Sequence, residues 1–206
     1  ALAAVVGVTL APSGAFATNG YFAHGYGSAN KALGGAGVAL PQSSMQAATN
    51  PAGMVYVGRR FDIGIEAFNP RRDYQSKNNP LFGSSDQDSE NSWFFIPHIG
   101  YNHMLSKTSS VGLTMYGNGG MNTRYPKPVF GSVGSGTERT GVNLAQLFMA
   151  FSYSQKMGDR ASVGIAPIFV YQRIAFEGFS KFPLFNTTSD AANISIPRNR
   201  NRPALL

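Results

Sequence analysis

From residue 58 onward, apolar and polar side chains alternate along the chain in five separate segments. Because successive side chains of a β-strand point to opposite faces, each segment is predicted to form a two-faced strand. Each segment is about ten residues or longer, which is the length that a tilted strand needs to cross a membrane. The predicted strands cover residues 58–69, 92–104, 109–118, 142–156 and 160–177.

The connections between these segments alternate in length. Residues 105–108 join the second strand to the third, and residues 157–159 join the fourth to the fifth. The other connections are long and cover residues 70–91, 119–141 and 178–206. Short turns on one side and long loops on the other are typical of outer-membrane barrels, whose short turns lie in the periplasm. The first strand would then run outward from the periplasm.

We therefore expect an all-β fold, a transmembrane antiparallel β-barrel with an N-terminal plug. A soluble β-sandwich or a lipocalin-like barrel is the alternative, but strands in such folds are usually shorter, about five or six residues. Aromatic residues near the ends of the apolar faces also favour the membrane, as an interfacial girdle (Trp93, Tyr101, Tyr153 and Tyr171). Since about five strands cannot enclose a wide lumen, we expect the chain to be the first part of a larger barrel.

The chain before the first strand divides into two parts. Residues 1–17 combine an apolar run, the helix breaker Pro12 and the triplet Ala15-Phe16-Ala17, which predicts the later part of a signal peptide. A short buried helix or strand is the alternative. Residues 18–57 are rich in Gly, Ala, Ser and Asn, lack regular periodicity and are predicted to form the plug, or hatch. Residues 58–206 would then hold the first strands and loops of an incomplete barrel.

The composition argues against several classes of function. Charged residues are 13% of the chain, about half the usual share for a soluble domain. The net charge is +7, but the basic residues form no stripe with interleaved aromatics, so nucleic-acid binding is not expected. The chain has no Cys, which excludes a disulfide framework and Cys-based zinc sites. His24, His98 and His103 lack metal-ligand spacing, and no catalytic residue, metal site or cofactor is expected.

Several motifs resemble one family. Residues 25–39 form a Gly-rich stretch, and it is followed by Asn50-Pro51-Ala52. Residues 96–101 read Ile-Pro-His-Ile-Gly-Tyr, and residues 111–117 read Val-Gly-Leu-Thr-Met-Tyr-Gly. Together these segments resemble the hatch and the second and third strands of the FadL-type outer-membrane transporters of long-chain fatty acids and aromatic hydrocarbons. The resemblance covers about residues 18–180. Pro41-Gln42-Ser43-Ser44 stands where family members often carry an acidic pair.

The Asn50-Pro51-Ala52 motif provides the candidate residues of the gate. Pro forces the preceding residue away from the helical conformation, and Asn supplies a local side-chain hydrogen bond. One interpretation is a tight turn that joins the plug to the first strand. The other, implied by the family resemblance, is that this turn anchors a mobile plug segment against the barrel wall.

Gly117, Gly119 and Gly120 stand at the end of the third predicted strand. Gly inside a strand marks a bulge or a bend. These residues could simply begin a flexible loop. The family resemblance implies instead a kink that interrupts the wall and opens a lateral exit into the membrane, which is costly unless the gap is plugged.

The inward faces of the last two strands are less polar than a water-filled porin needs. These faces carry Leu144, Phe148, Ile168 and Val170, and an apolar lumen suits an apolar ligand. Packing against the plug is the alternative, and both roles are compatible. By resemblance, Tyr21 and Phe22 would fill part of the ligand pocket and shift to release the ligand; a disordered tail is the alternative.

The function expected is passive uptake of hydrophobic small molecules, fatty acids or aromatic hydrocarbons, across the bacterial outer membrane. The partners would be that ligand and the lipid and lipopolysaccharide of the membrane. An adhesin-like surface barrel, a polar porin and an outer-membrane hydrolase are the alternatives. The hydrolase would need Ser, His and an orienting residue together on the outer wall, and the Ser residues here form no such pattern.

Overall fold

The computed structural model describes residues 20, 22–80, 83–130 and 139–178. The predicted signal peptide and Tyr21 lie outside these residues. The helical elements are α2 (Gly27–Ala32), η1 (Ser44–Ala48), η2 (Pro51–Gly53) and α3 (Met54–Val57). The strands are β1 (Arg60–Phe68), β2 (Asp73–Asn79), β3 (Gly83–Asp88), β4 (Phe94–Met104), β5 (Ser109–Tyr125), β6 (Thr140–Met157), β7 (Ala161–Ile165) and β8 (Ile168–Glu177).

One antiparallel sheet holds all five predicted strands, in the order β1-β4-β5-β6 followed by β7 and β8, which both pair with β6. β7 and β8 keep the same register on β6, since Ile165 lies opposite Tyr153 and Ile168 opposite Ala150. Pro167 stands between them, and its missing N–H interrupts the ladder without shifting it. The predicted strand over residues 160–177 is therefore divided into two strands that keep one register, and the strand-rich fold class is confirmed.

The structure differs from the expectation in the two long connections that it describes. Residues 70–91 hold a separate hairpin, β2–β3, that pairs only with itself in the described sheet. Its sequence is almost wholly polar, so it carries no alternation from which a strand could be predicted. β5 continues to Tyr125, beyond the predicted end at residue 118, and β6 begins at Thr140. Both extensions contain few apolar residues, and the one in β5 follows a bulge at Gly117–Gly120 that reverses the alternation.

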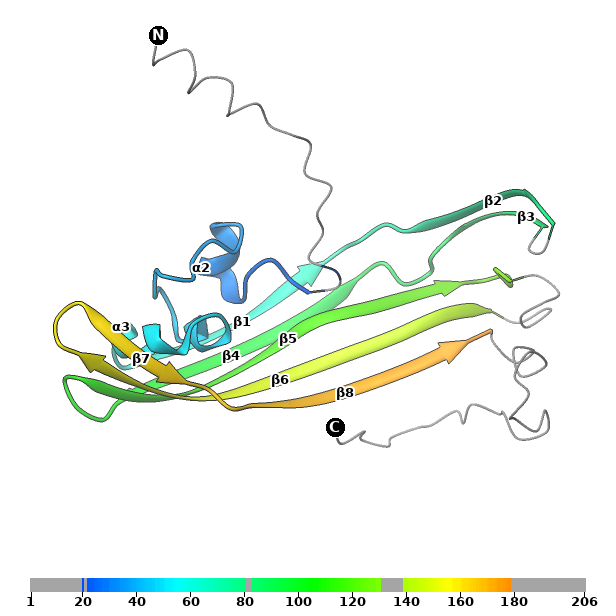
Figure 1. Ribbon diagram of the computed structural model, residues 1–206. Helices are drawn as coiled ribbons and strands as arrows, with labels where there is room; N and C mark the ends of the chain where they lie inside the picture. Colours follow the sequence, from blue (N-terminus) through cyan, green and yellow to red (C-terminus); the bar gives the residue numbers. More distant parts are fainter. Residues whose placement is uncertain (1–19, 21, 81–82, 131–138, 179–206) are drawn as a thin grey trace, which may run out of the picture.

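The short turns both lie at one end of the sheet, as predicted (Figure 1). The turn after β4 is closed by the amide of Leu105, which donates to the carbonyl of Ser109 at 2.9 Å. The turn after β6 begins at Gly158, whose φ of +71° favours glycine. The β2–β3 hairpin lies at the opposite end. This arrangement gives the short periplasmic turns and long outer connections that barrel topology requires.

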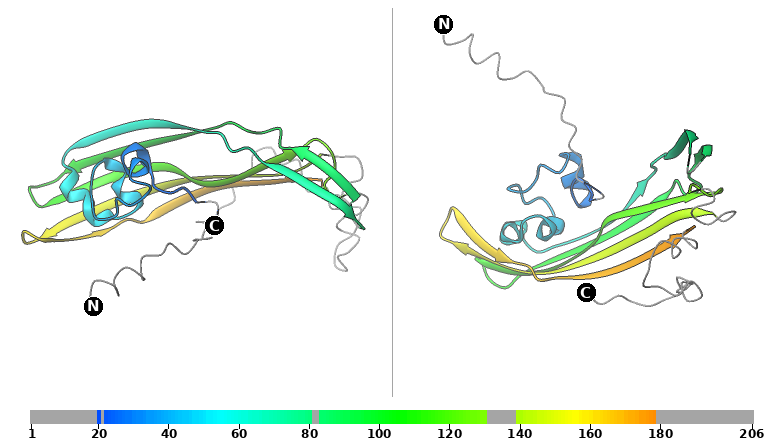
Figure 2. Two further views of the ribbon diagram at one scale, coloured as in Figure 1. Left: turned by 90° about the horizontal axis from the view of Figure 1, so that it is seen from above. Right: turned by 45° about the vertical axis from the view of Figure 1, so that its right-hand side comes forward.

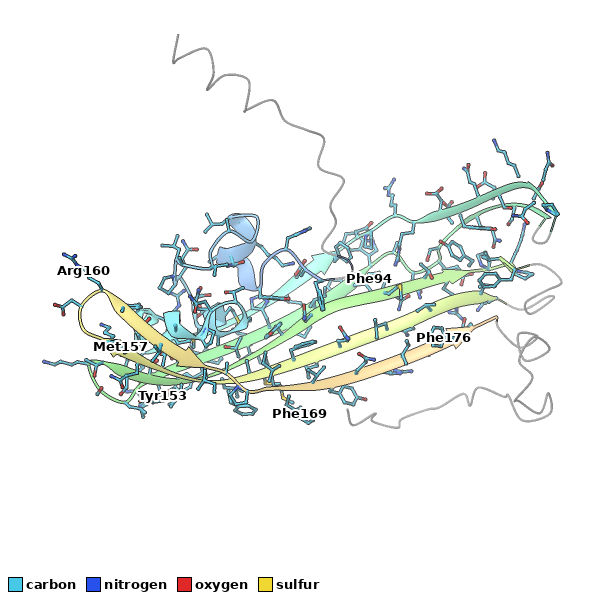
Figure 3. All side chains as sticks on the ribbon, viewed as in Figure 1. Phe94, Tyr153, Met157, Arg160, Phe169 and Phe176 are labelled. Carbon is cyan, nitrogen blue, oxygen red and sulfur yellow. The ribbon has the colours of Figure 1, made fainter. Side chains whose placement is uncertain are left out.

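The sheet is a curved trough, and the hatch lies on its concave side (Figure 2). The convex face carries exposed apolar side chains, among them Ile63, Ile65, Phe95 and Ile165, each about two-thirds exposed at 66–69%. Figure 3 shows Tyr153 and Phe169 on this face, turned away from the hatch. A soluble sheet would bury such a face, so this surface fits lipid contact.

The buried apolar cluster lies between the hatch and the concave face. Met45 of η1, Tyr116 of β5 and Ala150 of β6 form its centre, with Tyr26 and Phe148 among the residues packed against it. None of the helices in the described ranges is long and apolar enough to span a membrane. The concave side is therefore where the hatch is held and where a functional site has to be sought.

Candidate functional site

The second half of the hatch, residues 41–57, is fixed to the wall by polar side chains of the concave face. Asp62 of β1 accepts hydrogen bonds from the amide and the hydroxyl of Ser44 at 2.8 and 2.7 Å. The hydroxyl of Thr114 donates to the Ser44 carbonyl at 2.8 Å. Asn102 donates to the carbonyls of Met54 and Gly58 at 2.9 and 2.8 Å. Thr114 and Asn102 are fully buried, so these bonds are shielded from water and hold this half in place.

Asn50-Pro51-Ala52 lies in this fixed half and faces β7. The Asn50 side chain caps η2 by accepting from the Ala52 amide at 3.1 Å, and Pro51 takes the first helical position. The same side chain donates to the Val38 carbonyl at 3.0 Å, which ties the motif to the preceding loop. The Ser162 hydroxyl of β7 donates to the Ala52 carbonyl at 2.9 Å. The motif thus connects three segments: its own turn, the hatch loop and the wall.

Glycines of the concave face give the hatch backbone room to approach the wall. A Cβ atom on Gly164 of β7 would lie 2.4 Å from the Ala52 amide nitrogen, closer than real Cβ contacts allow. A Cβ atom on Gly100 of β4 would lie 2.9 Å from the backbone of Ser44. Any side chain at these positions would push the hatch away from the sheet. Glycine is required here for close contact between two backbones.

The first half of the hatch, residues 22–40, has fewer contacts with the wall. Lys31 of α2 forms an ion pair with Glu66 of β1. The hydroxyl of Tyr26 donates to the side-chain oxygen of Asn118 in β5, and its ring centroid lies 4.5 Å from that of Tyr116. Burial raises the pKa of the Tyr26 phenol, so the hydroxyl keeps its proton and remains a donor. This half therefore contacts the described wall through Lys31 on β1 and through Tyr26 on β5.

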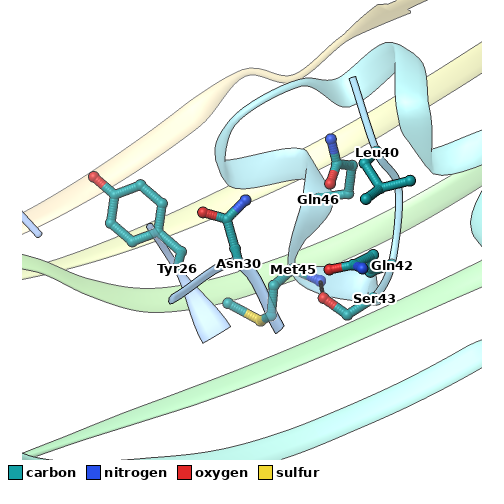
Figure 4. Close-up of a pocket in the computed structure, with 7 residues that line it drawn as sticks. All are labelled: Tyr26, Asn30, Leu40, Gln42, Ser43, Met45 and Gln46. Carbon is teal, nitrogen blue, oxygen red and sulfur yellow. Dashed lines mark hydrogen bonds between the residues drawn. The ribbon is translucent and has the colours of Figure 1, made fainter. Parts of the chain in front are cut away.

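Little space separates the two halves of the hatch. Tyr26 and Asn30 line one side of this narrow gap, and Met45, Gln46 and their neighbours line the other (Figure 4). The gap has no room for a water-sized molecule. A ligand could therefore reach the interior of the hatch only after the first half has moved.

The predicted glycine kink lies in β5 around Asn118, the residue that binds Tyr26. β5 and β6 keep a constant register up to Gly117 opposite Leu147, and the register shifts by one residue before Gly120 opposite Ala145. β5 therefore contains one extra residue, a β-bulge, and Gly119 within it has a φ of +76°. β5 stays paired with β6 beyond the bulge, so the interpretation of these glycines as the start of a loop is wrong.

On the side of β5 that faces β4, the hydrogen-bonded ladder ends close to this bulge. β4 pairs with β5 from Met104–Ser110 to His98–Tyr116, and the described pairing ends there, next to Pro97. Side-chain and backbone bonds between the two chain segments resume further out, where Asn91 donates to Asn122 at 2.8 Å and the Glu90 amide to the Arg124 carbonyl at 2.8 Å. We call the unladdered stretch between Phe94–Pro97 of β4 and Gly117–Met121 of β5 the seam.

The seam is closed in this structure by side-chain packing. The Ile96 side chain lies directly over Gly117, where a Cβ atom would meet its Cγ2 at 2.6 Å. Asn118, which is only 7% exposed, faces the hatch and binds Tyr26. The only part of the described wall where β5 leaves its neighbour is thus covered by one aliphatic side chain and one hatch residue.

Four of the predicted ligand-contact residues lie on the concave face, in one continuous area of β6 and β8: Leu144, Phe148, Ile168 and Val170. Phe148 stacks on Tyr116, with ring centroids 5.6 Å apart, and lies opposite Val170 in the register. Leu144 is buried, and Ile168, opposite Ala150, is exposed on the same face. Phe22, in the first half of the hatch, is exposed, and Tyr21 lies outside the described residues. The structure therefore brings the β6 and β8 residues together, next to the first half of the hatch.

Sequence reasoning missed the polar residues that connect hatch and wall. Tyr26, Asn102, Thr114 and Asn118 were not singled out, although each makes a hatch–wall hydrogen bond. A weak signal existed, because the polar faces of β4, β5 and β6 carry hydroxyl and amide side chains such as Asn102, Thr114 and Ser152. Within the described residues, no three His, Cys, Asp or Glu side chains are grouped to hold a metal ion.

Comparison with known proteins gave one result. The sequence profile of the family described as "Outer membrane protein transport protein (OMPP1/FadL/TodX)" matches residues 4–202, almost the whole chain. No curated protein and no solved structure matches the chain.

Proposed function

Because the chain belongs to the OMPP1/FadL/TodX family of outer-membrane transport proteins, we propose that it forms the gated section of a passive uptake route for small hydrophobic molecules. It is a bacterial outer-membrane protein, and its general function is the transport of hydrophobic compounds. The finer proposal concerns the route. The ligand enters along the apolar concave face, displaces the first half of the hatch and leaves sideways through the seam.

The seam is the observation that carries this proposal. A membrane-spanning wall normally pairs every backbone group, because an unpaired group in lipid costs several kcal/mol. Here the β4–β5 ladder ends at His98–Tyr116, although both strands continue. A defect in the wall that is covered by Ile96 and by a hatch contact is best explained as a passage that opens.

The chemistry of the concave face supports a hydrophobic ligand. Leu144, Phe148, Ile168 and Val170 line it beyond the hatch, and Ile168 is exposed there. Transfer of an apolar molecule from water to such a surface is favourable by about 25 cal/mol per Å² buried. Lys31 of the hatch and Arg60 of β1 are both paired with carboxylates. Fatty acids and aromatic hydrocarbons are the ligand classes that this lining supports.

The unequal attachment of the hatch supports the proposed movement. The second half is held on the wall by the bonds of Asp62, Asn102 and Thr114, whereas the first half contacts the wall through one ion pair and through Tyr26. The two halves are joined where Gln46 and Asn50 donate to the Val38 carbonyl. We propose that Asn50-Pro51-Ala52 is the fixed base against which the first half moves. A ligand that occupies the space of the Tyr26 ring beside Tyr116 and Phe148 would release it.

Uptake of labelled toluene and oleate tests the proposal. Cells that carry the intact gene product should accumulate one or both faster than a deletion strain at the same external concentration. Equal accumulation in the two strains would refute it.

Conductance in planar bilayers separates the proposal from a polar porin. The hatch fills the described periplasmic end, so the purified protein should give only small, intermittent currents. Large steady ion currents from the wild-type protein would favour the porin. An adhesin-like barrel would show neither uptake nor current.

A further inference from the structure

A row of three carboxamide side chains crosses the concave face just beyond the hatch. Gln146 of β6 and Gln172 of β8 lie opposite each other in the register. Asn118 lies in the bulge of β5, between Gly117 opposite Leu147 and Gly120 opposite Ala145, and so comes level with Gln146. We call these three residues the amide row. They come from three neighbouring strands that differ widely in sequence position, and the β-bulge brings Asn118 to this level.

The amide row interrupts an otherwise apolar lining. The row of side chains nearer the hatch holds Tyr116, Phe148 and Val170, and the row further out holds Met121, Leu144 and Ile174. A polar amide buried among such neighbours is unfavourable unless its hydrogen-bonding groups are satisfied. A lining that served only hydrocarbon would be more stable with Leu at these positions. The amides therefore point to a ligand that also carries a polar group.

The amide row has hydrogen-bonding capacity left over. The Gln146 amide nitrogen donates to the Gln172 side-chain oxygen at 2.5 Å. The Gln146 oxygen is buried and has no hydrogen-bond partner, and the half-buried Gln172 has N–H groups of its own beside the pair. If the oxygen and nitrogen positions of both carboxamides are exchanged, Gln146 is left with unused N–H groups in place of an unused oxygen. In either orientation the pair has both a donor and an acceptor to offer.

A hydroxyl group matches this capacity, because it donates one hydrogen bond and accepts others. The structure contains an internal example, since the Tyr26 phenol donates to Asn118 at one end of the row. Lys31, which meets the wall at Glu66 opposite Ile96, does not supply a free positive charge for a carboxylate, because it is paired with Glu66.

We propose that the amide row is a binding subsite for the neutral hydroxyl group of an amphipathic ligand, a phenol or an alcohol, whose apolar part lies along Phe148, Leu144 and Val170. This assignment rests on the proposed uptake function and specifies its substrate class. The ligand hydroxyl competes with the Tyr26 phenol for Asn118. Binding in the row is therefore coupled to release of the first half of the hatch.

Paired ligands test the subsite on the intact gene product purified in lipid nanodiscs. 4-Propylphenol and propylbenzene differ only in the hydroxyl, and their dissociation constants are measured for the wild type and for a double variant, Gln146→Leu with Gln172→Leu. The matched control is Asn143→Leu, which removes an exposed amide from the opposite, lipid-facing side of the same strand.

The wild type and Asn143→Leu should bind 4-propylphenol about tenfold more tightly than propylbenzene, the effect of one or two buried hydrogen bonds. The double variant should keep its affinity for propylbenzene and lose most of this preference. An unchanged preference in the double variant, or no preference in the wild type, would overturn the subsite while leaving hydrophobic transport intact. Failure of the wild type to bind either compound would instead count against the proposed function. Retained propylbenzene binding shows that the double variant is folded.

Discussion

Replacing Tyr26 with Phe tests whether the polar contact at the bulge helps to hold the first half of the hatch against the wall. The substitution removes only the hydroxyl that binds Asn118 and keeps the ring beside Tyr116. Asn118 is 7% exposed, so its side-chain oxygen is left without a donor and away from water. The loss of such a bond costs about 1–2 kcal/mol, which raises the population of the released form about 5- to 30-fold.

Hydrogen exchange followed by mass spectrometry measures this release in the intact protein in nanodiscs. Peptides over residues 27–35, whose amides are bonded within and just after α2, should exchange about 5- to 30-fold faster in Tyr26→Phe. Peptides over η1, η2 and α3 should keep their protection, because their bonds to Asp62, Asn102 and Thr114 are unchanged. The control is Tyr56→Phe, since Tyr56 is exposed and contacts Lys156 through its ring.

Unchanged exchange in residues 27–35 would show that the Tyr26–Asn118 bond does not hold this half. Equal acceleration in both halves would contradict the division into a fixed and a releasable part.

Three further predictions concern the base of the hatch and the Tyr26–Asn118 contact. Gly164→Ala should destabilise the protein by about 1–3 kcal/mol and increase bilayer conductance, because the new Cβ would collide with the Ala52 amide nitrogen; Val163→Ala on the lipid face should not increase it. Asn50→Ala should cost about 1–2 kcal/mol in thermal or chemical unfolding through loss of the η2 cap, with a further loss from its bond to Val38; stability equal to the wild type would contradict the anchoring role. The raised pKa of Tyr26 means that the folded state favours the neutral phenol. The stabilisation that the neutral phenol gives the folded state is complete below the unfolded pKa of about 10. It is lost as pH rises through the higher pKa of the folded state. Exchange of residues 27–35, corrected for the intrinsic rate, should therefore be constant from about pH 6 to 9 and should rise only above about 10; Tyr26→Phe should abolish that rise.

The pattern of alternation was sufficient to predict the main sheet, for a physical reason. A wall with lipid on one side must carry apolar residues at every second position, as Phe61, Ile63 and Ile65 do, and such a face is recorded directly in the sequence. The same reasoning could not find β2–β3, because neither face of this hairpin packs against lipid or an apolar core. Its sequence therefore shows no alternation of apolar and polar residues. It also ended β5 too early, because the bulge at Gly117–Gly120 reverses the alternation of the residues that follow.

The candidate site was predicted only in outline. The Asn50-Pro51-Ala52 motif, the glycines of the bulge and the apolar lining of β6 and β8 were found from local sequence. The contacts that make them a site were not, because Tyr26 and Asn118 are 92 residues apart in sequence. Likewise, the ladder between β4 and β5 ends at Pro97 and Gly117 without any composition change that would mark it. Long-range register is set by the whole sheet and not by any one segment.

A disulfide across the seam tests the central claim, that ligands leave sideways between β4 and β5. A Cβ atom on Gly117 would lie 3.9 Å from the Cβ of Ile96, within the range of about 3.5–4.5 Å that disulfides require. The natural chain has no Cys, so Ile96→Cys with Gly117→Cys introduces a single defined crosslink. The control crosslink, Ile99→Cys with Met115→Cys, joins the same strands at a position where they are already paired.

The structure explains why the seam should be the part that opens. Four residues of β4, Phe94–Pro97, have no described ladder bonds to β5. At about one bond per residue pair and about 1 kcal/mol each, a complete ladder would make opening about a thousandfold rarer. Toluene or oleate uptake is then measured in cells with each crosslink, oxidised and after reduction. The account predicts that the oxidised seam crosslink lowers uptake to the level of the deletion strain, that reduction restores it, and that the control crosslink has no effect. Full uptake through an oxidised seam would contradict the lateral route.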